Sequence, residues 1–246
     1  MNETSHVETF STRLAQLEDA IALACRQAGR KRESVRLMAV SKTHPARALA
    51  EAVAAGLTLF GENRVQEFEQ KSEELKTSGV ASAKVHLIGH LQSNKAARAT
   101  QLFDGIDSLD SLKLAERLDE AARRLQKQLP VLLEIKLSAE STKTGLLPES
   151  AALDALLERL PDLKSLTLRG LMTIAPLTPD ATRTRACFAE LRRLRERLSR
   201  EHPRLNFEEL SMGMSGDFAL AIEEGSTCIR VGSALFGRRP QPQLQS

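Results

Sequence analysis

The sequence predicts a single (β/α)8 TIM-type barrel preceded by one extra N-terminal helix. Short apolar segments alternate with amphipathic segments of helical period along the chain, and this alternation is typical of a parallel sheet covered by helices. The apolar segments number eight, enough to close a barrel, and the chain of 246 residues has the usual barrel size of about 250 residues. A doubly wound open sheet is the alternative fold.

The element boundaries follow from the spacing of the apolar residues. After a first helix at residues 10–25, the strands are expected at 35–40, 58–60, 85–88, 105–106, 131–137, 166–172, 207–210 and 227–231. The helices between them are expected at 46–55, 63–76, 93–102, 111–128, 148–160, 179–200 and 215–224. No linker or low-complexity segment divides the chain, so residues 1–246 are expected to form one domain with its core at about 30–237.

The composition excludes several classes of protein. No apolar run approaches the roughly 20 residues of a membrane helix, and a net charge of +3 is too small to indicate a nucleic-acid partner. In the arginine-rich helix at 179–200, glutamates interleave with the arginines beside an apolar stripe, which is typical of a solvated outer helix. The three cysteines are odd in number and widely spaced, so a cytoplasmic protein with reduced thiols is expected. His86 and His90 share a strand face without a third ligand at motif spacing, so no metal site is expected.

Polar segments follow five of the expected strands, at the end where barrel active sites lie. Among them, Lys42 ends a strongly apolar strand. A lysine that loses solvation at the barrel rim favours its neutral amine, which is the nucleophile that forms a Schiff base with an aldehyde. A surface lysine whose stem lies on the rim is the alternative, and on position alone it is the commoner case.

The segments after the last two strands indicate a phosphate site. Ser215 and Gly216 are expected to open the last helix, where backbone N–H groups and a hydroxyl can bind an anion. Gly232 and Ser233 offer the same chemistry. An ordinary helix cap and a tight turn are the structural alternatives. Together with Lys42, these residues describe a site for an aldehyde that carries a phosphate.

Arg230 lies inside the last expected strand, two residues before Gly232. A buried guanidinium is costly without a partner and can only donate hydrogen bonds. It could therefore serve an unprotonated pyridine nitrogen, or it could form a salt bridge with a barrel carboxylate such as Glu134. Both interpretations stay open at this point.

Seven motifs resemble those of the pyridoxal phosphate homeostasis proteins, whose fold resembles the barrel domain of alanine racemase. They are AVSKT at 39–43, FGENRVQE at 60–67, IGHLQSNK at 88–95, LRGLM at 168–172, LSMGMSGD at 210–217, IEEGST at 222–227 and RVGSALFG at 230–237. The resemblance covers about residues 35–237 in the same order. It departs mildly at residues 173–176, where no role is assigned, and at position 233, where serine replaces the common threonine and keeps the hydroxyl.

The resemblance implies a role for each matching position. Lys42 would hold pyridoxal 5'-phosphate as a Schiff base, and Arg230 would be the partner of the pyridine nitrogen. The expected phosphate cradle is Ser215, Gly232 and Ser233. Asn63 and His90 would lie near the cofactor ring.

The same residues bear on whether the protein is an enzyme. An arginine at the pyridine nitrogen disfavours the protonated ring that makes the cofactor a strong electron sink. Alanine racemase also uses an arginine but adds a second domain and a tyrosine base, whereas this sequence contains no tyrosine and ends shortly after Gly237. We expect a non-catalytic, monomeric carrier that buffers the cofactor and supplies apo-enzymes that use it. The alternative is a weakly active racemase or lyase of amino acids with His90 as its base.

Overall fold

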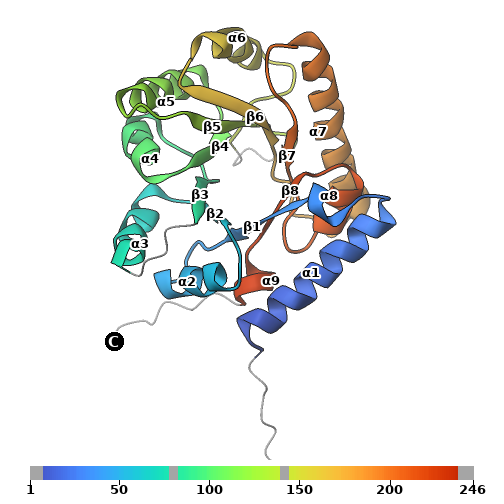
Figure 1. Ribbon diagram of the computed structural model, residues 1–246. Helices are drawn as coiled ribbons and strands as arrows, with labels where there is room; N and C mark the ends of the chain where they lie inside the picture. The colour runs from blue at the N-terminus through green and yellow to red at the C-terminus, as the bar shows by residue number, and fades with distance from the viewer. Residues whose placement is uncertain (1–7, 78–82, 139–143, 238–246) are drawn as a thin grey trace, which may run out of the picture.

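Eight parallel strands close into a barrel in the order of the sequence in the computed structural model (Figure 1), which confirms the predicted fold. The structure describes residues 8–77, 83–138 and 144–237, so the predicted domain of residues 1–246 extends beyond the described part. The strands are β1 (Arg36–Val40), β2 (Leu59–Glu62), β3 (Lys84–Leu87), β4 (Gly105–Leu109), β5 (Leu129–Glu134), β6 (Leu166–Met172), β7 (Glu209–Ser211) and β8 (Cys228–Val231).

Helices surround the barrel on its outer face (Figure 1). They are α1 (Phe10–Gln27), α2 (Ala46–Ala54), α3 (Val65–Thr77), α4 (Ala96–Leu102), α5 (Leu112–Arg124), α6 (Ala151–Arg159), α7 (Ala181–Glu201), α8 (Phe218–Glu223) and α9 (Ser233–Phe236). The extra helix α1 packs against α8 and α9. Its Arg13 side chain also donates a hydrogen bond of 2.8 Å to the carbonyl of Leu235 in α9.

Several boundaries differ from the prediction, and three elements show a physical reason for the difference. β4 continues to Leu109, beyond the predicted end at 106, because Asp107 and Ser108 are polar residues that the strand buries. α5 ends four residues earlier than predicted, just before Gln126 takes a positive φ of 51°. α9 was not predicted, since its four residues are too few for a periodic pattern to be visible.

The apolar core divides into two clusters on opposite sides of the strands. In β1, Leu37 and Ala39 belong to the large cluster that includes the helices, whereas Met38 and Val40 join a separate small cluster with Ile88. Because successive side chains of a strand point to opposite faces, the small cluster lies in the barrel interior and occupies part of it. The rest of the interior therefore has to be filled by other side chains.

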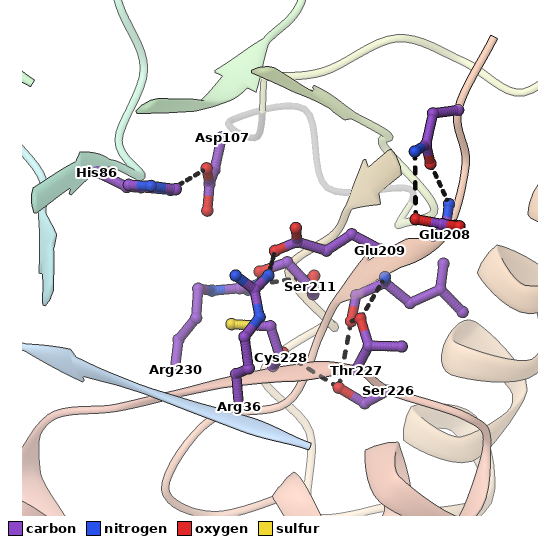
Figure 2. A network of polar contacts seen from close by, with 12 residues as sticks. Arg36, His86, Asp107, Glu208, Glu209, Ser211, Ser226, Thr227, Cys228 and Arg230 are labelled. Atoms are coloured by element: carbon purple, nitrogen blue, oxygen red, sulfur yellow. Dashed lines mark hydrogen bonds and ion pairs between the residues drawn. The ribbon is translucent and has the colours of Figure 1, made fainter. Parts of the chain in front are cut away.

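Polar side chains occupy much of that interior (Figure 2). Arg36 and Glu209, the first residues of β1 and β7, form an ion pair. The imidazole Nδ1 of His86 on β3 lies 2.9 Å from a carboxylate oxygen of Asp107 on β4. The other carboxylate oxygen of Asp107 is buried without a hydrogen-bond partner among the described residues. His86 is thus a packed strand residue, held by a carboxylate.

Opposing effects act on the pKa of His86. Burial lowers the pKa, but the charge and hydrogen bond of Asp107, helped by Glu209, raise it above its ordinary value, against a smaller opposing effect of Arg36. A folded-state pKa above the unfolded one means that protonation stabilises the fold. This stabilisation is fully present below the unfolded pKa of about 6.5 and disappears as the pH rises through the folded pKa.

We predict that replacing His86 by glutamine costs more stability at acid pH than at alkaline pH. The difference in unfolding free energy between the two proteins should be about 1.5–3 kcal/mol near pH 6, the value of a hydrogen bond to a charged group, and should shrink as the pH rises. Urea titrations of both proteins at a series of pH values measure it. A difference that stays constant with pH would contradict the charged state assigned to His86.

Candidate functional site

A cavity of about 680 Å³ opens where the strands end, a volume within the range of small-molecule sites. The structure brings to it all seven residues predicted from the sequence. They are Lys42, Asn63, His90, Ser215, Arg230, Gly232 and Ser233. Lining the cavity does not by itself assign a role to a residue, because the role depends on the local geometry.

Lys42 reaches the cavity because it follows β1 by two residues. Val40, the last residue of β1, also lines the cavity and is buried. Lys42 itself is half-buried, as expected for a lysine whose aliphatic stem lies against apolar barrel residues. The amine of Lys42 is therefore in a position to meet a small molecule in the cavity.

Arg230 lies in β8 beneath this lysine and is 4% exposed. Its guanidinium donates hydrogen bonds of 2.7 and 2.8 Å to the carbonyl and hydroxyl of Ser211 (Figure 2). It donates a third, of 2.7 Å, to the carbonyl of Thr173. Burial lowers the pKa of Arg230, although surrounding acidic groups raise it in part, and an arginine stays charged in proteins. Among the described residues its hydrogen-bond partners are neutral, so the alternative of a salt bridge with Glu134 is not what the structure shows.

The segments after β7 and β8 meet at one side of the cavity. The backbone N–H of Ala234 in α9 lies 3.5 Å from the hydroxyl oxygen of Ser215. The expectation that Ser215 and Gly216 open the last helix is wrong, because α8 begins at Phe218 and both residues lie in the turn before it. The short helix next to the cavity is instead α9, which follows Gly232 directly. A short helix after β8 is the usual partner of the phosphate-binding loops of barrel enzymes.

Asn63 and His90 approach the cavity from β2 and β3. The backbone at Gly89 passes so close to Asn63 that a Cβ atom on Gly89 would lie 2.3 Å from the Asn63 carbonyl oxygen. His90 is half-exposed, and its Nδ1 lies 3.0 Å from a carboxylate oxygen of Asp110. Gly89 is thus required for the close packing of the two loops that carry these side chains.

Sequence reasoning missed several polar residues of the cavity wall. They are His44, Glu134, Lys136, Ser138 and Thr144. Burial raises the pKa of Glu134, and the nearby Asp110 raises it further, while Thr144, His90 and Arg230 oppose the shift. Four of these residues end or follow β5. The rule that barrel sites lie at the strand ends also applies to the segment after β5, and it is the sequence signal that indicates them.

Two further expectations concern the described residues as a whole. No helix among them is long and apolar enough to cross a membrane. Within the same residues, His, Cys, Asp and Glu side chains form no group of three or more that could hold a metal ion.

Comparison with known proteins places this geometry in a family. Residues 13–240 match the family described as alanine racemase, N-terminal domain. The pyridoxal phosphate homeostasis protein of Pasteurella multocida is 40% identical over 231 residues, which cover 94% of this chain and 98% of that protein. The chain belongs to the pyridoxal phosphate homeostasis proteins.

Solved structures agree with this family. PipY of Synechococcus elongatus, described both without and with pyridoxal phosphate bound, is 45% identical and covers 93% of this chain and 100% of its own, with TM-scores of 0.84 and 0.83. An alanine racemase of Clostridium difficile is 15% identical with a TM-score of 0.68, and the match covers 96% of this chain but 58% of the racemase. The racemase likeness shows the barrel fold alone.

We predict that Gly89→Ala destabilises this member of the family, because the added Cβ would overlap backbone that cannot move freely. The expected loss is about 1–3 kcal/mol of unfolding free energy, the usual cost of overpacking. Gly216→Ala is the matched control in the same cavity wall, since no heavy atom lies within 4 Å of a Cβ built there. Urea titration measures both, and an equal effect of the two substitutions would contradict the close approach at Gly89.

Proposed function

We propose that this protein binds pyridoxal 5'-phosphate in the cavity as a Schiff base on Lys42, and that it stores and supplies the cofactor without catalysing a reaction of its own. The observation that carries the proposal is the meeting of an amine, a buried guanidinium and a cluster of hydroxyl and amide donors in one cavity. PipY, which is described with pyridoxal phosphate bound, supports the choice of ligand.

The residues present fit each chemical group of this cofactor. Ser215 and Ser233 supply hydroxyls, and Gly216 borders open space in which a phosphate oxygen can approach the backbone. The cavity wall also carries the cationic side chains of Lys42 and Arg230, which suit an anionic ligand. When bound, the cofactor supplies an aldehyde carbon that condenses with an amine and releases one molecule of water.

Arg230, together with the absence of tyrosine from the sequence, favours a carrier over an enzyme. It donates three hydrogen bonds to neutral groups, and a guanidinium has no lone pair with which to hold a proton on a pyridine nitrogen. An acidic partner at that position would keep the ring protonated and make the cofactor a strong electron sink. A cationic donor there supports storage of the aldehyde, with little activation of a bound amino acid.

The cysteines and the opening of the cavity bear on the cellular compartment of the protein and on its partners. The three cysteines are buried and form no disulfide among the described residues, which supports a reducing compartment such as the cytoplasm. Ile174, Met214 and the almost fully exposed Leu177 line the cavity, so the ligand can enter and leave past apolar side chains. We propose a monomer that releases the cofactor to apo-enzymes through this opening.

We predict that Lys42→Ala abolishes the visible imine absorbance of the protein after incubation with pyridoxal 5'-phosphate. The matched control is Lys136→Ala, which removes a second lysine from the same cavity wall and should leave the absorbance in place. Borohydride reduction followed by peptide mass spectrometry locates the attached lysine independently. Unchanged absorbance in Lys42→Ala, or loss of absorbance only in Lys136→Ala, would overturn the assignment of Lys42.

One observation favours a second candidate function. His90 reaches the cavity with its ring oriented by Asp110 at 3.0 Å, and a base held by a carboxylate is a common catalytic arrangement. A weakly active racemase or lyase of amino acids could use it.

Exchange of α-protons decides between the two functions. With the cofactor-loaded protein and a set of amino acids in deuterated water, we predict no exchange faster than about 1 per second, the lower end of enzyme turnover. NMR follows the exchange, and His90→Gln is the control variant. Exchange above that rate that disappears in His90→Gln would establish the enzyme and refute the carrier.

A further inference from the structure

A buried charged cluster lies behind Lys42, outside the lining of the cavity. It consists of Ser41, Glu62, Glu67 and Lys71, from the end of β1, the end of β2 and helix α3. Glu62 is fully buried and Lys71 is 8% exposed. We call these four residues the Glu62 cluster.

Lys71 is the centre of the Glu62 cluster. Its ammonium group donates hydrogen bonds of 2.8 Å to Glu62 and 2.9 Å to the carbonyl oxygen of Ser41. It also forms an ion pair with Glu67 at 3.1 Å. The ammonium therefore ties two carboxylates to the backbone of the residue that precedes Lys42.

The same carboxylates hold the residues on both sides of Lys42. The Ser41 hydroxyl donates to Glu62 at 2.8 Å, and the backbone N–H of Thr43 donates to Glu67 at 2.5 Å. Burial alone would raise the pKa of Glu67, but the Thr43 N–H and Lys71 lower it, so Glu67 accepts these hydrogen bonds as a carboxylate. The peptide units that flank Lys42 are thus fixed before and after it.

Thr43 shows why such fixing is needed. Its φ is +66°, a conformation that is uncommon for any residue other than glycine and an outlier for a β-branched one. Backbone strain of this kind persists where surrounding contacts enforce it, and it is concentrated at functional sites. The Thr43 side chain is exposed and does not line the cavity. The turn is held by the hydrogen bond from the Thr43 N–H to Glu67, together with a backbone hydrogen bond of 3.1 Å from the His44 N–H to the Ser41 carbonyl oxygen.

The Glu62 cluster costs free energy of folding, because it buries charged groups. Burial raises the pKa of Glu62 against the opposing effect of Lys71, and one of its carboxylate oxygens has no hydrogen-bond partner among the described residues. Apolar residues of similar size commonly replace buried ion pairs without loss of stability. The Glu62 cluster contacts the residues on both sides of Lys42. We therefore infer that its cost in free energy is retained because it has a role in the site.

We propose that the Glu62 cluster is a positioning device for Lys42: it holds the turn 41–43 in its strained conformation so that the Lys42 amine enters the cavity. This inference rests on the proposed function, in which that amine condenses with the aldehyde of pyridoxal 5'-phosphate and one water molecule is released. Glu67 and Lys71 do not line the cavity, so they act through the backbone. They should control formation of the covalent bond more than binding of the phosphate.

The test is Glu67→Ala, which removes the acceptor of the Thr43 N–H from a partly exposed position. Glu73→Ala is the matched control, since Glu73 lies on the same helix and pairs with the exposed Lys76. On addition of pyridoxal 5'-phosphate to apo-protein, the visible imine absorbance should appear about tenfold more slowly in Glu67→Ala than in the wild type, as expected for loss of one hydrogen bond to a charged group. It should appear at the wild-type rate in Glu73→Ala.

Binding of pyridoxine 5'-phosphate, which carries an alcohol in place of the aldehyde, separates positioning from collapse of the site. Its dissociation constant should change less than about twofold in Glu67→Ala, because the phosphate cradle lies on other loops. A parallel loss of affinity for this analogue would show general damage to the cavity and overturn the inference.

A second substitution tests the strained turn directly. Glycine adopts positive φ without steric cost, so Thr43→Gly added to Glu67→Ala should restore most of the rate of imine formation. Failure of this rescue would contradict the role of the turn. If the wild type itself forms no imine with pyridoxal 5'-phosphate, the proposed function fails; if Glu67→Ala forms it at the wild-type rate, only the positioning inference fails.

Discussion

The parallel pairing of β8 with β1 closes the barrel, and the site depends on this pairing. Met38 is opposite Arg230, and Ala39 is opposite Val231, so the two strands end at the same level although they come from opposite ends of the sequence. Lys42 and Gly232 follow those strand ends and consequently line one cavity. Helix α1 covers the closure from outside through its contacts with α8 and α9. This explains why a barrel of this size carries an extra helix at the seam where its first and last strands meet.

Two buried cationic side chains, Arg230 and Lys71, lie near the end of β1, and they differ in their partners. Arg230 is held by neutral hydrogen-bond acceptors, so its positive charge stays available to a ligand in the cavity. Lys71 is neutralised by two carboxylates and holds the backbone next to Lys42. Burying charges is expensive. Arg230 lines the same cavity as Lys42, and Lys71 contacts the backbone of the residue that precedes it. The cost is therefore concentrated where a reactive amine has to be placed accurately and an anionic ligand has to be attracted.

Periodicity was sufficient to predict the barrel, because most strands and helices bury one regular apolar face. It failed where the burial was polar: the buried polar residues Asp107 and Ser108 concealed the second half of β4. The seven predicted site residues could be found because they follow strand ends that converge in any parallel barrel. The contacts of Arg230 could not be predicted, since the choice between Ser211 and Glu134 depends on the register of β7 and β8 and on the depth of each side chain. The start of α8 was misplaced because Ser215 and Gly216 resemble a helix cap.

We propose that one cavity holds pyridoxal 5'-phosphate between Lys42, Arg230 and the loops after β7 and β8. A crystal structure of the protein grown with this cofactor is the decisive measurement. We expect continuous electron density from the Lys42 side chain to the cofactor, the Arg230 guanidinium at the pyridine nitrogen, and the phosphate between Ser215 and Ser233. Density for the cofactor elsewhere, or within the cavity but with the phosphate away from these serines and no bond to Lys42, would refute this arrangement.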